Sequence, residues 1–188
     1  MVGTAAGSTT ADCLAGGRAF GHAVASFAGS LDQVAEVRRF LHRQLEGHPH
    51  LDDVTLATSE LAANACAHSD SGRPGGTFAV AAGYFASLAF LAVADAGSTE
   101  RQPRFPSTPR DPLTLLEAES GRGLAIVAGL ALRAGWNHLD GAAGAGRYVW
   151  GVFGTPPASP IDILTSLAIG VLHTALLPTP PGASPANT

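Results

Sequence analysis

The stretch from Leu51 to His68 constrains the fold most, because its pattern is that of one long helix lying against a core. Apolar residues recur at helical spacing and form a stripe that would face this core: Val54, Ala57, Leu61 and Ala65. Glu60 and Asn64 fall one turn apart beside the stripe, and His68 continues their row. A carboxylate and a carboxamide placed in this way can hold a divalent cation and a water. The same row is also typical of the solvated edge of an amphipathic helix, so this helix alone does not decide between the two.

Two glycine motifs downstream favour the functional interpretation. Residues 88–94 are nearly all apolar, which predicts a central strand. Asp95-Ala96-Gly97 follows them directly. Asp95 would therefore project a carboxylate from the mouth of the core, although Asp is also common as a turn residue after a strand. After a gap rich in Pro and Arg, Gly121-Arg122-Gly123-Leu124 opens a second helical pattern. The order of the three motifs favours a functional role for Asp95 over a turn.

Glu and Asn on a helix, Asp-x-Gly after a strand and Gly-x-Gly-Leu before a helix resemble the N, G1 and G2 boxes of the GHKL ATPase superfamily, which has the Bergerat fold. Within it, Ser-Glu-Leu-Ala-Ala-Asn-Ala…His-Ser at 59–69 and Gly-Arg-Gly-Leu-Ala-Ile-Val at 121–127 are most similar to bacterial anti-sigma factor serine/threonine kinases. The resemblance covers about residues 20–153. It implies an α+β fold, a two-layer α/β sandwich whose mixed, mostly antiparallel sheet is covered on one face by helices.

Composition excludes several other classes of protein. All eleven basic residues are Arg, so the chain has neither a Walker A lysine nor the lysine of a eukaryotic-type protein kinase. The net charge of −4 provides no field for non-specific binding of nucleic acid, so we expect no direct nucleic-acid partner. Cys13 and Cys66 form neither a disulfide framework nor a Cys-x-x-Cys site. No basic region leads into an apolar run at the N-terminus, so we expect a cytoplasmic protein.

The periodicity predicts one domain at residues 18–154, after a disordered leader of small and polar residues at 1–17. Its first elements are an edge strand at 18–27 and a helix from Ser30 to about Glu46. Ser30 and Gln33 form a capping-box signature for that helix. The remaining predicted elements are the helix at 51–68, strands at 77–82 and 88–94, a helix at 123–132, and strands at 134–140 and 146–153.

Two segments depart from a minimal domain of this kind. Residues 98–120 contain four prolines and three arginines without periodicity, and their place between the glycine motifs matches the ATP lid of the resembled family. Residues 155–188 begin as a Pro-rich linker and continue in an apolar run at 161–177. Because that run is shorter than the roughly 20 residues of a spanning helix, a C-terminal interaction helix is favoured, while membrane contact stays open.

The resemblance implies an ATP site between the helix at 51–68, the lid and the sheet. Asp95 would accept a hydrogen bond from the adenine amino group, and Gly97 would let the backbone pass close to the base. Guanine has a carbonyl at that position, so a buried carboxylate would discriminate against it. Asn64 would give its amide oxygen to Mg²⁺, a cation that prefers oxygen ligands. The phosphates would lie at the start of the next helix, where the binding residues are Gly121, Arg122, Gly123 and Leu124.

Glu60 is the candidate catalytic base, which must lie within hydrogen-bond reach of the proton that it takes. In ATPases of the superfamily it orients water, whereas in the anti-sigma kinases it would activate a serine hydroxyl of a partner protein. The resemblance thus implies ATP and Mg²⁺ as cofactors, a sigma factor and a STAS-type anti-sigma antagonist as partners, and a homodimer. His68 and Ser69 match the family's wording and are assigned to support of the helix end. For Arg147, which opens the last predicted strand, a surface role is favoured over a phosphate contact.

Three other functions compete with the kinase. A catalytically silent ATP-binding interaction module would have the same fold, but such a binder has no need of Glu60 as a base. A histidine-kinase catalytic domain is disfavoured because only about thirty residues precede the first predicted helix, which leaves no room for a dimerisation helix with a phosphoacceptor His. A membrane-tethered variant depends on residues 161–177 alone.

Overall fold

A computed structural model of the chain describes residues 20–85, 87–98, 102–105, 122–139, 146–154 and 170. The elements predicted from the periodicity are present, with boundaries shifted by one to three residues for most of them. In chain order they are β1 (Phe20–Ala28), α2 (Gln33–Gln44), α3 (Leu51–His68), the short 3-10 helix η1 (Asp70–Gly72), β2 (Thr77–Phe85), β3 (Leu88–Asp95), α5 (Arg122–Leu130), β4 (Arg133–His138) and β5 (Arg147–Phe153).

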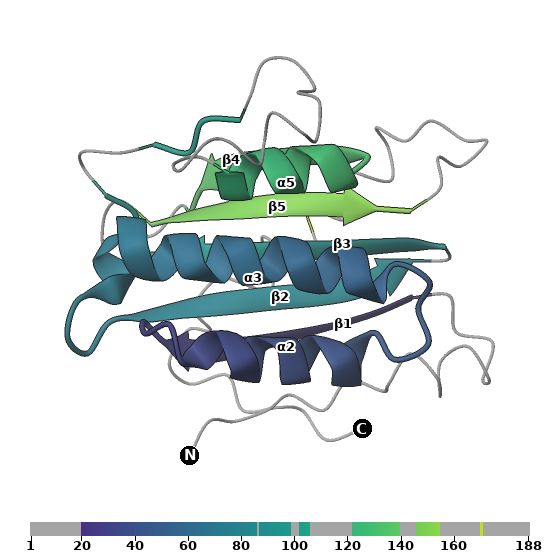
Figure 1. The fold of residues 1–188 in the computed structure, drawn as a ribbon, viewed down its shortest axis with the longest axis horizontal. Coiled ribbons are helices and arrows are strands. Elements are labelled where there is room, and N and C mark those ends of the chain that lie inside the picture. Colours follow the sequence, from purple (N-terminus) through teal and green to yellow (C-terminus); the bar gives the residue numbers. More distant parts are fainter. Residues whose placement is uncertain are drawn as a thin grey trace.

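The five strands form one open sheet in the order β1-β2-β3-β5-β4, and Figure 1 shows them side by side. Every described pair is antiparallel, where the sequence had predicted a mixed, mostly antiparallel sheet. The strand β1 is an edge strand, as predicted. The strand β3 lies at the centre and pairs with β5, which follows it only after α5 and β4. This crossover places the end of β3 beside the beginning of β5.

The described helices α2, α3 and α5 cover one face of the sheet, so the fold is the predicted two-layer α+β sandwich. Figure 1 shows α2 and α3 lying across this face. Alternate strand residues point toward the helices and pack with them in a cluster that we call the inner cluster. Phe27 of β1 stacks on Phe78 of β2 and contacts the ring of Phe40 of α2 edge-on. The inner cluster contains residues of every α-helix and of strands β1, β2, β3 and β5.

The beginning of α2 differs from the prediction. The helix starts at Gln33 with Asp32 at its N-cap, and no side chain caps it. The predicted capping box between Ser30 and Gln33 is therefore wrong. The reason is local: the N–H of Gln33 donates to the carbonyl oxygen of Ser30, and the N–H of Val34 to that of Leu31, so a backbone turn already satisfies these donors. At the other end, Gly47 has a φ of +76°, which suits the predicted glycine just beyond the helix.

The strand β3 is buried along its whole length, on both sides. Its residues that point away from the helices belong to a second cluster, which we call the outer cluster. Its members come from β2, β3 and β5: Ala81, Leu88, Phe90, Ala92, Ala94, Tyr148 and Val152. An apolar central strand requires such cover on both faces, and the helices that the structure describes supply it on one face only.

Several predictions fall outside the described residues. These are the disordered leader, the lid at 98–120 apart from residue 98 and residues 102–105, and the tail at 155–188 apart from Gly170. The domain boundaries at 18 and 154 accordingly stay predictions. Among the helices that the structure describes, none has the length and apolar character needed to cross a membrane.

Candidate functional site

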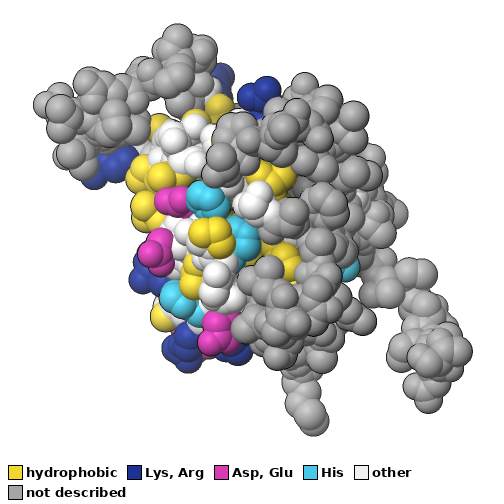
Figure 2. Space-filling view, turned by 90° about the vertical axis from the view of Figure 1, so that its right-hand side faces the viewer, with side chains coloured by type: hydrophobic (Ala, Val, Ile, Leu, Met, Phe, Trp, Pro, Cys, Tyr) yellow, Lys and Arg dark blue, Asp and Glu magenta, His cyan; other side chains and the backbone are white. Residues whose placement is uncertain are grey.

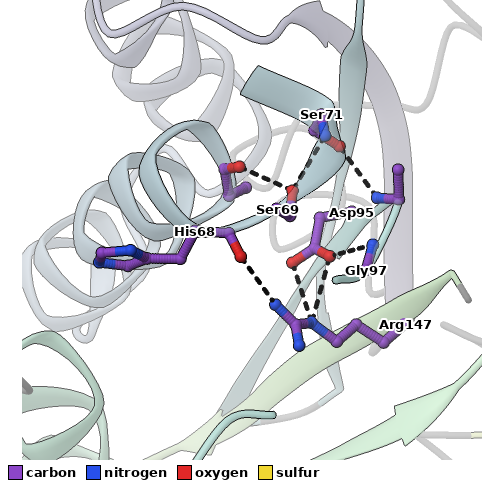
Figure 3. Close-up of polar contacts among 8 residues, drawn as sticks. His68, Ser69, Ser71, Asp95, Gly97 and Arg147 are labelled. Carbon is purple, nitrogen blue, oxygen red and sulfur yellow. Dashed lines mark hydrogen bonds and ion pairs between the residues drawn. The ribbon is translucent and has the colours of Figure 1, made fainter. Parts of the chain in front are cut away.

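The Asp95 carboxylate lies at the end of β3, where it is held by the turn that follows. It is 9% exposed. The N–H of Gly97 donates to its Oδ1 at 2.6 Å, and Gly97 itself has a φ of +73°. That left-handed conformation is readily adopted by glycine and rarely by other residues, so Gly97 is needed for the turn. Figure 3 shows the carboxylate between this turn and β5.

Arg147 forms an ion pair with Asp95, which the sequence did not predict. The register of β3 and β5 makes the two residues direct partners. The Nε atom of Arg147 lies 3.2 Å from Oδ1 and 3.4 Å from Oδ2, and the two side chains are only 8% and 7% exposed. Its Nη2 donates to the carbonyl oxygen of His68 at 3.5 Å, at the end of α3. The surface role favoured for Arg147 is therefore wrong, because the sheet register turns its side chain inward.

The charge of Asp95 depends on two opposing effects. Burial raises the pKa of its carboxyl, since the ionised form loses hydration. The guanidinium of Arg147 and the N–H of Gly97 act in the opposite direction and hold the charged form. The Gly97 bond is short and the Arg147 contacts are long, so the carboxylate keeps capacity to accept further hydrogen bonds.

A network of serines ties the end of α3 to the turn after β3 (Figure 3). The hydroxyl of Ser69 donates to the carbonyl oxygen of Ala65 and accepts from the N–H of Ser71. The buried Ser71 hydroxyl accepts from the N–H of Ala96 at 2.9 Å. Ser69 thus supports the helix end, as predicted, and the position of Asp95 relative to α3 is fixed through these bonds.

A second group of predicted residues meets where α5 crosses α3. Glu60 and Asn64 are half-buried on α3, and Gly123 is buried in the first turn of α5. A Cβ atom at Gly123 would lie 3.0 Å from Nδ2 of Asn64 and 3.1 Å from Oε2 of Glu60. Only a residue without a side chain leaves both polar groups undisturbed. The absence of a Cβ therefore lets the first turn of α5 approach the carboxylate and the carboxamide directly.

The chemistry of this group fits a nucleotide phosphate with Mg²⁺. Among the described residues, no cluster of three His, Cys, Asp or Glu side chains could hold a metal ion by itself. Mg²⁺ characteristically takes one or two protein oxygens, with water and phosphate as its other ligands. Asn64 could supply such an oxygen, and the first turn of α5 offers backbone N–H groups to a phosphate. Asn64 and the first turn of α5 therefore fit the predicted Mg²⁺ ion and phosphate.

The other predicted binding residues have different surroundings. Leu124 packs against the inner cluster, so its side chain contributes to the core. Arg122 is half-buried at the start of α5. Gly121 lies outside the described residues. The structure brings Glu60, Asn64 and Gly123 together, and it places Asp95 and Gly97 at the C-terminal end of the same helix.

The family model for the histidine kinase-like ATPase domain matches residues 27–144, which is more than half of the chain. No curated protein matches the chain significantly. The matched stretch includes Glu60, Asn64, Asp95, Gly97 and the G2 motif. It ends before Arg147, so the match does not include the residue that forms the ion pair with Asp95.

Proposed function

The chain belongs to the histidine kinase-like ATPase domain family, within the GHKL superfamily, and from this premise we propose that it is an ATP-dependent serine/threonine protein kinase of the anti-sigma type. One observation carries the proposal: Glu60 and Asn64 of α3 meet Gly123 of α5, and the hydrogen bonds at the C-terminal end of α3 hold the turn after Asp95 in place. A general base, a metal ligand, a phosphate-binding turn and a carboxylate that recognises the adenine ring would then surround one ligand. Their proximity supports ATP as that ligand and Mg²⁺ as its metal.

Asp95 would recognise the adenine ring. Its buried carboxylate retains acceptor capacity beside the Gly97 N–H and can accept a hydrogen bond from the amino group of adenine. Guanine would present a carbonyl oxygen to the same carboxylate, and two buried acceptors facing each other cost free energy. The discrimination therefore depends on Asp95 being ionised.

Glu60 would act as the general base in phosphoryl transfer. The hydroxyl oxygen of a partner's serine forms a bond to the γ-phosphorus, its proton passes to the Glu60 carboxylate, and the bond from the γ-phosphorus to the bridging oxygen breaks to release ADP. Asn64 would hold Mg²⁺, which would offset the negative charge of the phosphates. The Gly123 backbone lies beside Glu60, which supports a phosphate position next to this general base.

The partners follow from the resemblance of residues 59–69 and 121–127 to anti-sigma kinases. A serine of a STAS-type antagonist would accept the phosphate, and a sigma factor would be sequestered by the same chain in the cytoplasm. The kinase would thereby regulate transcription by partner switching, with a homodimer as the assembly that the resemblance implies.

A titration with ATP tests the site, with and without Mg²⁺, on the native chain, Asp95→Asn and Glu60→Ala. We expect the native chain to bind ATP, Asp95→Asn to lose binding, and Glu60→Ala to keep it. Far-UV circular dichroism checks that each variant is folded. A native chain that ignores millimolar ATP would overturn the proposal.

Phosphotransfer is then measured with γ-labelled ATP and a panel of STAS-type proteins. We expect label on a serine with the native chain and none with Glu60→Ala. Binding of ATP without transfer to any acceptor would instead identify a catalytically silent module that uses ATP as a regulatory ligand.

A further inference from the structure

The outer face of the sheet has the composition of an interface. Its central part, from β2, β3 and β5, is apolar, and the outer cluster there combines three alanines with the larger side chains of Leu88, Phe90, Tyr148 and Val152. Its margins are mixed, with Ser26 next to the apolar Val24 on β1 and Asn137 on β4. The alanines let another element approach this surface closely, and the larger side chains add apolar area for that element to bury.

No described helix contributes to the outer cluster. Every helical residue in the two buried clusters belongs to the inner one. Even so, the outer cluster is as well buried as the core: Ala92 is 0% exposed, Phe90 1% and Tyr148 2%. These fractions are those of one copy of the chain, which points to a cover from within the chain.

We propose that residues 161–177 form a C-terminal helix that packs on the outer face of the sheet and covers the outer cluster. This stretch contains nine Leu, Ile and Val residues and one charged residue, Asp162. Transfer of such side chains onto apolar strands removes them from water, at about 25 cal/mol for each Å² of apolar surface buried. Gly170, the one described residue in this stretch, is helical.

The dimensions of the segment and the sheet agree. Seventeen residues form a helix of about 25 Å, and the eight residues of β3 span about 26 Å. A helix is about 10 Å wide, which matches three strands spaced about 4.8 Å apart. A helix of this length would cover β2, β3 and β5 from end to end.

The chain leaves the sheet at the right place. It exits from β5 at Gly154, whose φ of +143° turns the backbone, and a Cβ there would lie 2.7 Å from a side-chain atom of Leu88, a member of the outer cluster. The exit is thus at the rim of the outer face. The six residues 155–160 can span up to about 20 Å, enough for the segment to turn back over the sheet.

Other segments of the chain fit the outer face less well. Residues 1–19 contain only three large aliphatic side chains: Met1, Val2 and Leu14. The segment between β3 and α5 touches the other side, because Phe105 packs against the inner cluster. Residues 140–145 are mostly glycine and alanine.

Thiol labelling of the full chain tests this assignment, in a background of Cys13→Ser and Cys66→Ser. Ala92→Cys places a probe on the outer face, and Ala89→Cys places a matched probe three residues away on the inner face; both positions are fully buried. We expect both cysteines to be protected, while Ser26→Cys at the exposed margin reacts quickly. The double variant Leu167→Asp/Leu172→Asp would break the proposed contact. In this variant the cysteine at 92 should react as fast as the cysteine at 26, while the cysteine at 89 should stay protected.

Linker substitutions Thr155→Asp and Ser159→Asp provide the matched control, because they add the same charge outside the segment. They should leave both probes protected. Protection at 92 that survives the substitutions at 167 and 172 would overturn the proposal, and protection that weakens on dilution would assign the face to a second copy.

A cross-linking experiment covers the case in which the doubly charged variant unfolds. Single cysteines at Leu164, Leu167 and Leu172 are each paired with the probe at 92 and treated with a short bismaleimide. We expect a cross-link within the monomer, independent of concentration, for at least one pair. Absence of an intramolecular cross-link in all three pairs would overturn the proposal.

Discussion

At the scale of single residues, the unexpected feature is the pairing of Asp95 with Arg147. The strand and motif patterns identified Asp95 and Gly97, since a carboxylate and a glycine directly follow an apolar run. They could not identify Arg147, because its partner is set by the pairing of β3 with β5, two strands separated by α5 and β4. The ion pair gives Asp95 a counter-charge in a place where burial opposes its ionisation.

Loss of the Arg147 charge should destabilise the protein and change its dependence on pH. Removal of one partner from a buried ion pair typically costs about 3–5 kcal/mol, so we expect Arg147→Met to lower the free energy of unfolding by about that amount. Without the counter-charge the pKa of Asp95 rises further, and ATP binding should be lost at a higher pH than in the native chain. Urea unfolding and ATP titrations between pH 5 and 8 measure both effects.

The matched control is Arg133→Met, because Arg133 is exposed on β4. It should change the free energy of unfolding by less than about 0.5 kcal/mol. An equal loss in the two variants would mean that the ion pair has no special role in stability.

Two glycines of α5 offer a sharper comparison. A Cβ at Gly123 would press on Asn64 and Glu60, whereas a Cβ at Gly129 has nothing within 4 Å. We expect Gly123→Ala to weaken ATP binding at least tenfold, which is about 1.4 kcal/mol. Gly129→Ala should leave binding unchanged and raise stability by up to about 1 kcal/mol through helix propensity. Isothermal titration calorimetry and thermal unfolding of the two variants provide the measurements.

At the scale of elements, the long apolar patterns were the most informative. Residues 51–68 form α3 with the predicted boundaries, because its stripe, its acidic first turn and its packing all require the same helix. The start of α2 was predicted wrongly because backbone hydrogen bonds of the preceding turn replace the side-chain cap. The residue types alone do not show which of the two forms. The connection between α2 and α3 holds His48 and His50, whose ring centroids lie 6.0 Å apart, and Figure 2 shows histidine side chains on one face of the molecule.

This connection should make the fold sensitive to mild acid. Burial lowers the pKa of the His48 imidazole from its ordinary value of 6.5, and the neighbouring His50 lowers it further. Below pH 6.5 the unfolded chain therefore binds a proton that the folded chain resists, so the stability contributed by neutral His48 is lost as the pH falls. We expect urea midpoints to drop between pH 7.5 and 5.5.

The variant His48→Gln should show a flatter dependence of the urea midpoint on pH over that range. His42→Gln, an exposed position in the last turn of α2, should behave as the native chain does. If both variants keep the full acid sensitivity, another group is responsible.

At the scale of the whole molecule, the sheet separates two apolar layers. The sequence predicted the helical layer in detail, because each helix shows a 3.6-residue stripe. The burial of the opposite face was not predicted beyond the apolar character of β3, since periodicity says which residues are buried and not what covers them. The candidate site combines α3 and α5 of the helical layer with the end of β3 and the start of β5, and α3 is the wall that its parts share.

Binding of ATP to that wall should stabilise the molecule as one unit. A ligand present at a hundredfold excess over its Kd raises the free energy of unfolding by about 2.7 kcal/mol. We expect this increase for the native chain with ATP and none for Asp95→Asn, measured by urea unfolding with and without nucleotide. GTP at the same concentration should have little effect on the native chain, and equal stabilisation by GTP would contradict adenine recognition by Asp95.

The direct pairing of Asp95 with Arg147 also makes strand alignment visible in solution. Successive strand residues point to opposite faces, so a slip of one residue between β3 and β5 would send the carboxylate to the wrong side of the sheet. The ion pair joins residues that are 52 positions apart, and it exists in only one alignment. The fraction of a preparation able to bind nucleotide would then count the correctly aligned molecules, and a ligand titration would serve as an assay of folding fidelity.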